Sequence, residues 1–289
     1  MKDSLQRFLF EHAPVRGELV HLDATWQAVL DRHDYPAPLR RILGELMAAA
    51  GLLAATLKFD GAMVLQLHGS GPVKLLVVEC TSEQTLRATA KWEGELGGDD
   101  LPALLGTGRF VITLVGEDRG QTYQGVVDLA GRSVAACLEH YMLSSEQLET
   151  RLWLATDDTQ AAGMLLQRLP GQTEQDDDAW RRIGHLAATL KPEELLGLDA
   201  RTILHRLYHE DDVRLFEARP VSFRCSCSTE RVVSMLRMLG PDEVRSVVAE
   251  QGGVEVTCEF CNKRYRLDPV DAEQVFAADS MSPAGPTRH

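Results

Sequence analysis

The chain has 289 residues, of which 44% are hydrophobic and 25% are charged, and its formal net charge is −13 at pH 7. This length predicts about two domains, and the apolar content is sufficient for a sizeable core. The acidic balance argues against a nucleic-acid backbone as the main partner, and the absence of any run of about 18 apolar residues argues against a membrane span.

The first 60 residues favour helices. Between residues 36 and 57, apolar side chains recur at a spacing of about 3.6, and Pro38 lies early enough for a helix to tolerate it. The segment therefore predicts a long helix with an apolar stripe, formed by Leu39, Ile42, Leu43, Leu46 and Met47.

Strand patterns follow this helix. Two apolar runs in residues 62–78 flank a turn-forming stretch at 69–72. Residues 85–96 alternate between apolar and polar side chains, and residues 110–129 predict a hairpin with a polar turn near 117–120. Antiparallel strands with helices segregated around them indicate an α+β fold. We assign an N-terminal core of antiparallel sheet and helices to residues 1–170.

A further helix is predicted at about 133–143, with Cys137 on its apolar stripe. Cys80 closes an apolar strand. Buried free cysteine behaves as a small hydrophobic residue. We therefore interpret Cys80 and Cys137 as structural free thiols.

The amino-acid composition of the chain changes at about residue 171. Residues 171–220 are rich in charged side chains, favour helices and contain few strand patterns, so they form either a linker or amphipathic helices docked on a neighbour. His205 and His209 could share one face of such a helix, but no HExxH motif accompanies them, and we interpret them as surface residues. Residues 269–289 predict a C-terminal helix and a disordered tail.

Four of the six cysteines form two close pairs in residues 221–268. Cys225 and Cys227 make a C-x-C pair, and Cys258 and Cys261 make a C-x2-C pair, followed by Asn262, which tolerates a left-handed turn. The segment between the pairs predicts two short helices and a strand that ends at Cys258. Two thiolate pairs are typical of a tetrahedral zinc site, with sulfurs about 3.8 Å apart for Zn–S bonds of about 2.3 Å.

The residues leave open whether this centre is structural, redox-active or both. The start of the chain lacks the apolar run of a secretory signal. We therefore expect a cytoplasmic protein, in which close cysteine pairs are more often metal-binding or catalytic than permanently bridged. Such a small domain is difficult to stabilise without a metal or disulfides.

Other chemistries for the centre are disfavoured. A zinc deaminase needs H-x-E and P-C-x-x-C, but Thr257 precedes Cys258 and no H-x-E occurs. Nucleophile-elbow, Walker and dinucleotide-binding motifs are likewise missing from the sequence, so we expect no enzyme. Two alternatives stay open. A zinc-ribbon nucleic-acid module is disfavoured by seven basic and seven acidic residues in 221–268, and a thiol-disulfide oxidoreductase would place its C-x-x-C at the start of a helix.

The two pairs and several other segments resemble the redox-regulated heat-shock chaperones of the 33 kDa chaperonin family. The resemblance extends over almost the whole chain through VRGE at 15–18, FDG and QLHGSGP within 59–72, YQGVV at 123–127, YMLSSEQL at 141–148, GMLLQ at 163–167 and RLYHEDDV at 206–213. It implies a non-enzymatic, ATP-independent holdase for unfolded client proteins, with one Zn²⁺ per chain when reduced. From the charge and the lack of a long apolar run, we expect no nucleic-acid or membrane partner.

The resemblance also implies a switch. Under oxidising stress, Cys225 would pair with Cys227 and Cys258 with Cys261, and zinc would leave. The zinc-binding domain at 221–268 and the metastable linker at 171–220 would then lose structure, and the reduced monomer would give way to an oxidised homodimer. The apolar linker residues expected to lose their partners are Trp180, Leu186, Leu195, Leu198, Leu204 and Leu207.

Overall fold

The computed structural model describes residues 3–116, 122–170 and 174–277. The chain divides into two compact units, Met1–Arg224 and Cys225–His289. Among the described helices, none combines the length and apolar character needed to cross a membrane. The mixed helix and sheet content confirms the predicted α+β class.

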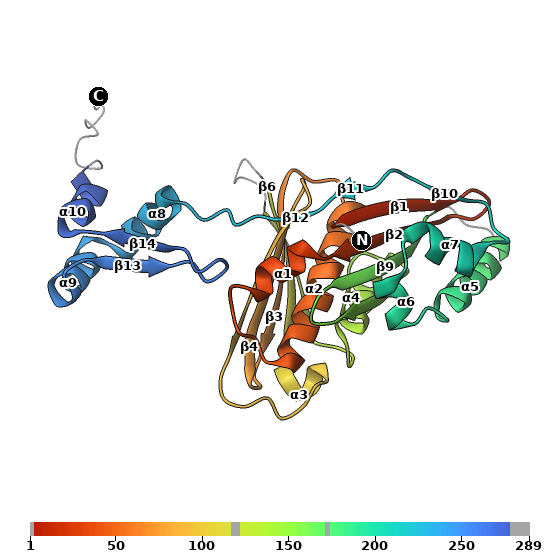
Figure 1. Cartoon of the computed structure of the whole chain (residues 1–289), viewed down its shortest axis with the longest axis horizontal. Helices are drawn as coiled ribbons and strands as arrows, with labels where there is room; N and C mark the ends of the chain where they lie inside the picture. The colour runs from red at the N-terminus through yellow and green to blue at the C-terminus, as the bar shows by residue number, and fades with distance from the viewer. Residues whose placement is uncertain (1–2, 117–121, 171–173, 278–289) are drawn as a thin grey trace, which may run out of the picture. The chain divides into compact units, whose positions relative to one another are not determined.

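The first unit contains two sheets of six strands each (Figure 1). The first sheet has the order β10-β1-β2-β9-β8, with β11 also paired to β1, and the second has the order β12-β5-β4-β3-β6-β7. The strands of the first sheet are β1 (Ser4–Phe10), β2 (Val15–Leu22), β8 (Thr150–Thr156), β9 (Ala161–Arg168), β10 (Val213–Leu215) and β11 (Arg219–Pro220). Those of the second are β3 (Gly61–Gly69), β4 (Val73–Thr81), β5 (Thr85–Trp92), β6 (Gly108–Gly116), β7 (Thr122–Asp128) and β12 (Ser222–Phe223).

Helix α2 (Ala37–Thr56) contacts strands of both sheets and confirms the helix predicted at 36–57. Its second half is buried on every side, from Leu46 to Ala55. A helix that is apolar all round belongs in a core. The remaining helices of this core are α1 (Ala24–Leu30), α3 (Leu101–Leu105) and α4 (Val134–Ser144).

The hairpins predicted from residues 62–78 and 110–129 are confirmed as β3–β4 and β6–β7, and the alternating stretch is β5. The polar turn predicted near 117–120 lies outside the described residues. Cys80 and Cys137 are both buried in the main core.

The prediction of helices throughout the first 60 residues is wrong for residues 4–22. These residues form the hairpin β1–β2, in the centre of the first sheet. Their partners β9, β10 and β11 lie about 140 to 216 positions further along the chain, so the pairing that makes them strands is not visible in the local pattern. Gly17 allows the close approach of the Phe8 ring, which a side chain at this position would strike.

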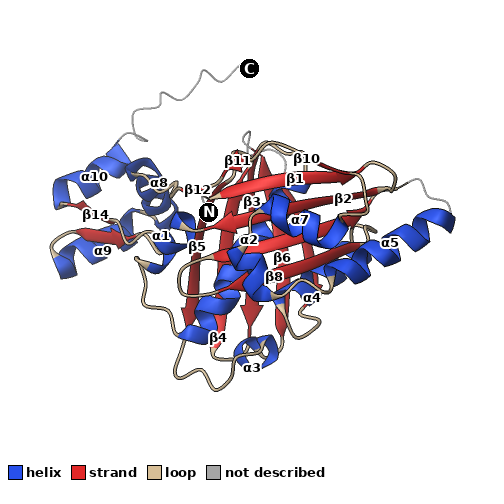
Figure 2. Ribbon diagram, turned by 45° about the vertical axis from the view of Figure 1, so that its right-hand side comes forward, coloured by secondary structure: helices blue, strands red, loops and turns tan. Residues whose placement is uncertain are grey.

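Residues 174–208 form three helices that cover the face of the first sheet opposite α2 (Figure 2). They are α5 (Glu174–Ala187), α6 (Pro192–Gly197) and α7 (Ala200–Tyr208). Their apolar faces and the sheet together form one cluster, hereafter the helix–sheet cluster, which contains Phe8, Phe10, Val15, Leu19, Met164 and Leu166 from the strands. All six apolar linker residues singled out in the sequence belong to it, four of them buried and Leu186 and Leu198 partly buried. Residues 174–208 of the predicted segment are thus docked amphipathic helices, whereas the helical prediction is wrong for residues 213–215 and 219–220, which are strands β10 and β11 paired with β1.

The second unit is small. Helices α8 (Thr229–Leu239), α9 (Pro241–Gln251) and α10 (Pro269–Ala277) surround the hairpin β13 (Val254–Thr257) and β14 (Arg264–Leu267). Among its described residues the buried core has eight members, Val232, Leu236, Val244, Val254, Tyr265, Leu267, Ala272 and Val275. So few apolar side chains indicate that the unit needs a further source of stability.

Candidate metal centre

The structure brings together the side chains of all four cysteines of the two pairs. Their sulfur atoms lie within 4.8 Å of one another. The Sγ atoms of Cys225 and Cys258 are 3.7 Å apart, and those of Cys227 and Cys261 are 3.4 Å apart. A tetrahedral thiolate site with Zn–S bonds of about 2.3 Å would need sulfurs about 3.8 Å apart. The four residues could therefore hold a metal ion, and an all-sulfur donor set suits zinc.

Local structure positions each pair. Cys225 and Cys227 lie just before α8, whose N-cap Ser228 accepts a hydrogen bond from the backbone N–H of Arg231. The Arg231 side chain reaches back and donates to the Ser226 hydroxyl at 2.7 Å. Arg231, in the first turn of the helix, thus contacts the residues on either side of Cys227.

Cys258 and Cys261 belong to the turn between β13 and β14. The backbone N–H of Asn262 donates to the Cys258 carbonyl at 2.9 Å, and the N–H of Cys258 donates to the Lys263 carbonyl at 2.9 Å. Asn262 has a φ of 58°, so the left-handed conformation predicted for it is confirmed. This turn directs both thiols of the pair to one point.

The electrostatics of the cluster favour a cation. Burial, followed by contact with the other thiols, raises the pKa of the Cys261 thiol to about 12, and burial raises the pKa of Cys258. Four adjacent thiolates repel one another, and a bound divalent cation removes this penalty by holding them deprotonated. All four cysteines are partly exposed, so small oxidants can reach them.

Tyr265 is a residue of the centre that the motif did not reveal. Its hydroxyl donates to the Cys227 Sγ at 3.0 Å, and the Lys263 ammonium lies 4.9 Å from the centre of its ring. In β14, Tyr265 and Leu267 are buried and alternate with exposed arginines. This alternation in the sequence could have predicted that the side chain of Tyr265 is buried.

The other candidate residues lie outside the centre. Both thiols are buried in the core, and burial raises the pKa of Cys137 to about 11 and that of Cys80 strongly, which disfavours the reactive thiolate form. His205 and His209 are exposed on and just after α7, with ring centres 6.1 Å apart, and no described cysteine or carboxylate joins them in a metal-binding group.

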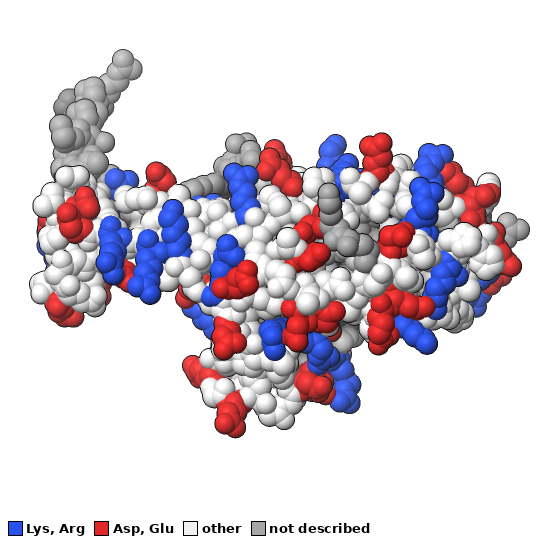
Figure 3. All heavy atoms as spheres, viewed as in Figure 1, with Lys and Arg blue, Asp and Glu red and all other residues white. Residues whose placement is uncertain are grey.

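Lys263, Arg264 and Arg266 form a small basic cluster in the second unit, and an acidic residue lies beside it. The side chains of Arg264 and Arg266 both contact Glu255 on β13, at 3.9 Å and 2.5 Å. Over the first unit, acidic and basic side chains are interspersed on the face drawn in Figure 3. Neither arrangement is the basic stripe that a nucleic-acid surface requires.

Comparison with known proteins assigns the family. The family model described as Hsp33 protein matches residues 3–268. The 33 kDa chaperonin of Chromobacterium violaceum is 56% identical and covers 99% of this chain and 98% of its own length, and that of Methylobacillus flagellatus is 53% identical and covers 100% and 99%. The crystal structure of the 33 kDa chaperonin from Thermotoga maritima has the same fold, with a TM-score of 0.82 at 22% identity over 97% of this chain and 100% of that one. The chain therefore belongs to the Hsp33 family.

Proposed function

We propose that this chain is an ATP-independent holdase chaperone that is switched by oxidation of its four clustered cysteines. In the reduced form, Cys225, Cys227, Cys258 and Cys261 would bind one Zn²⁺ as thiolates, and the protein would be inactive. The observation that carries the proposal is the placement of these four sulfurs within 4.8 Å of one another. When bound, zinc would supply a tetrahedral crosslink between the start of α8 and the β13–β14 turn.

The free energies of the zinc-bound and the disulfide-bonded forms favour unfolding of the second unit on oxidation. Structural zinc in small domains contributes about 10–16 kcal/mol of coupled folding free energy. Disulfides within each pair, Cys225–Cys227 and Cys258–Cys261, would close rings of three and four residues, worth only about 1.6–1.9 kcal/mol each. The short sulfur distances instead join one pair to the other. Oxidation within the pairs would therefore replace a crosslink between distant segments by two local rings, and a unit with so small a core should unfold.

The client-binding surface would come from the helix–sheet cluster. Residues 171–220 act in this proposal as the metastable linker, and loss of the 221–268 domain would free α5, α6 and α7 from the first sheet. Opening would expose Phe8, Phe10 and Leu19 on the sheet, which are now buried, together with the apolar faces of the helices. Contiguous exposed apolar surface beyond a few hundred Å² is a mark of interaction sites. Unfolded proteins would bind there, and a homodimer would form in the oxidised state in the cytoplasm.

An aggregation assay tests this function directly. Peroxide-treated protein should suppress light scattering from a thermally unfolding client without nucleotide, whereas the reduced, zinc-loaded protein should not. Zinc release, measured with a chromogenic chelator, should accompany activation. Hydrogen exchange should show protection lost over residues 171–268 and kept in the strands between about 60 and 130. Client binding by a fully protected linker would contradict the mechanism, and turnover of dithiol substrates would favour an oxidoreductase instead.

A further inference from the structure

A polar hollow lies on the α2 side of the first sheet, beyond the end of that helix. In the strand register, Arg7 is opposite Glu18, Leu9 is opposite Arg16, and Leu5 is opposite Arg219. Residues directly opposite each other in antiparallel strands share a face, and so do residues two apart on one strand. Three arginines and a glutamate are therefore on one face, and they line a hollow of about 590 Å³ together with Leu9 and the segment 216–218.

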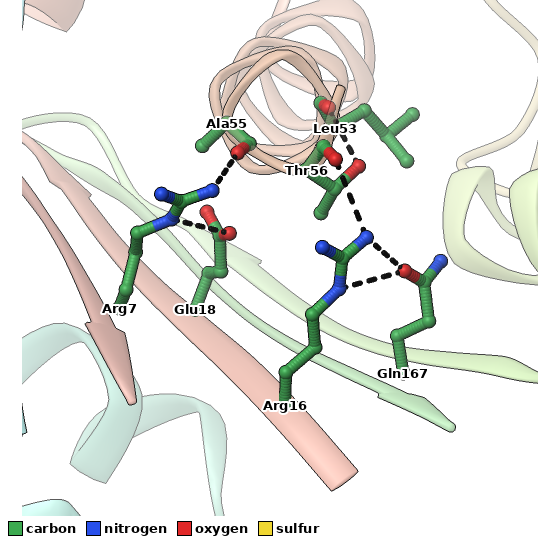
Figure 4. Close-up of polar contacts among 7 residues, drawn as sticks. All are labelled: Arg7, Arg16, Glu18, Leu53, Ala55, Thr56 and Gln167. Carbon is green, nitrogen blue, oxygen red and sulfur yellow. Dashed lines mark hydrogen bonds and ion pairs between the residues drawn. The ribbon is translucent and has the colours of Figure 1, made fainter. Parts of the chain in front are cut away.

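Two of the arginines also hold the end of α2. Figure 4 shows both guanidinium groups reaching the last turn of the helix: Arg7 donates to the Ala55 carbonyl at 2.6 Å and Arg16 to the Thr56 carbonyl at 3.3 Å. Arg16 is oriented by Gln167, whose side-chain oxygen accepts from its Nε at 2.9 Å. The last carbonyls of a helix lack intrahelical donors and carry partial negative charge. These contacts give Arg7 and Arg16 fixed positions.

The charges around the hollow are not balanced. Glu18 is only 1% exposed; one of its oxygens accepts from Arg7 at 3.2 Å, and the other has no hydrogen-bond partner among the described residues. Arg219 is exposed and pairs with no carboxylate in the described part of the chain. Burial raises the pKa of Glu18 to about 7, against the opposing effect of Arg7, Arg16 and Arg219. With Glu217 the only other acid in the lining, the formal charge near neutral pH lies between +1 and +2 in a chain of net charge −13.

We propose that this hollow binds a small organic oxyanion, a sulfate, phosphate or carboxylate group carried on an apolar or aromatic body. Guanidinium groups match the geometry of such oxyanions and bind them through paired hydrogen bonds. Leu9 and Phe216, the latter 43% exposed, supply an apolar wall beside the arginines. The hollow is larger than a bare tetrahedral anion needs and lies within the range of small-molecule sites, roughly 300–1,000 Å³.

Occupancy would affect the end of the helical segment. Arg219 lies on β11, which follows α7 in the chain, whereas Arg7 and Arg16 lie on the central strands β1 and β2. An anion that contacts all three would add a further link between β11 and the strands β1 and β2, and a ligand that binds only the docked form stabilises that form. The hollow is built from residues of the first unit and the cysteine cluster from residues of the second, so the proposal does not rest on the redox function.

Calorimetric titration of the full, reduced chain at constant ionic strength tests the site. The probes are sulfate and phenyl sulfate, because their charge does not change between pH 6 and 8. We expect saturable binding with one site per chain, tighter for phenyl sulfate, and Arg219→Gln should weaken it by roughly tenfold or more through loss of a charge-assisted hydrogen bond. Arg132→Gln is the matched control, because it makes the same charge change at an 84% exposed side chain paired with Asp100.

Two further variants separate the parts of the proposal. Phe216→Ala should remove the preference for phenyl sulfate and leave sulfate binding unchanged. Because an ionised Glu18 repels an anion, sulfate affinity should fall from pH 6 to pH 8 in the parent chain and stay constant in Glu18→Gln. Absence of saturable binding by either probe, or equal weakening by Arg219→Gln and Arg132→Gln, would overturn the site. Equal affinity for both probes would overturn the organic ligand class.

Discussion

Tyr208 offers the sharpest test of the role of the docked helices. It lies at the end of α7, is 2% exposed, and packs edge-on against Phe10 of the sheet, with ring centres 4.9 Å apart and an interplanar angle of 79°. Its hydroxyl donates to the Ile183 carbonyl on α5 at 3.3 Å. One side chain therefore joins α7 to both α5 and β1, so its truncation should loosen the segment without touching the cysteines.

The magnitudes predict a graded response. Tyr208→Phe removes only the hydrogen bond, worth about 0.5–1.5 kcal/mol net. Tyr208→Ala also removes the ring, and such truncations cost about 3–5 kcal/mol. Because about 1.4 kcal/mol is a factor of ten in an equilibrium, opening of residues 174–208 should rise several-fold in the first variant and more than about 100-fold in the second.

Hydrogen exchange of the reduced, zinc-loaded variants measures this opening, and client light scattering in the presence of reductant measures its effect. We expect Tyr208→Ala to suppress aggregation without oxidation and Tyr208→Phe to do so weakly or only on warming. Tyr141→Ala is the matched control, because Tyr141 is also 2% exposed, stacks edge-on with Phe110 and donates to Glu146, but lies in the main core. It should lower overall stability without selective opening of 174–208. Lost protection in Tyr208→Ala without any gain in client binding would refute the reasoning.

Three further outcomes are expected. Tyr265→Phe should lower zinc affinity about 10–100-fold, since groups that hydrogen-bond metal ligands typically contribute that much; unchanged affinity in a chelator competition would show that its contact with Cys227 is incidental. Cys80→Ala and Cys137→Ala should leave zinc content and oxidant activation intact, and loss of switching in either would mean that the redox centre is misassigned. His21 is buried below α6, where its Nε2 lies 2.8 Å from the Leu195 carbonyl oxygen, and burial lowers its pKa, so the docked form favours the neutral imidazole. Docking should therefore be strongest above pH 6.5 and weaken by up to about 1.4 kcal/mol per pH unit below it, whereas exchange in His21→Gln should show no such dependence.

The sequence by itself determined the features whose cause is local. The spacing of the four cysteines predicted the candidate metal centre, because thiolates that bind one metal ion typically occur as close pairs along the chain. The helix at 37–56 and the hairpins of the second sheet followed from periodicity, since their partners lie within a few turns or across a short loop. The change at about residue 171, from alternating apolar runs to charged helix-forming sequence, predicted the amphipathic helices α5, α6 and α7.

Only the tertiary structure decided features that depend on distant partners. Residues 4–22 are strands because β9, β10 and β11 pair with them from the far end of the first unit. Arg7, Arg16 and Arg219 surround one hollow because strand register brings them to one face, and their positions in the sequence carry no sign of it. Tyr265 belongs to the cysteine centre because its hydroxyl donates a hydrogen bond to the thiol of Cys227, 38 residues away in the chain. A local sequence pattern indicates which conformation a segment prefers. Which distant segment it contacts depends on the packing of the whole chain.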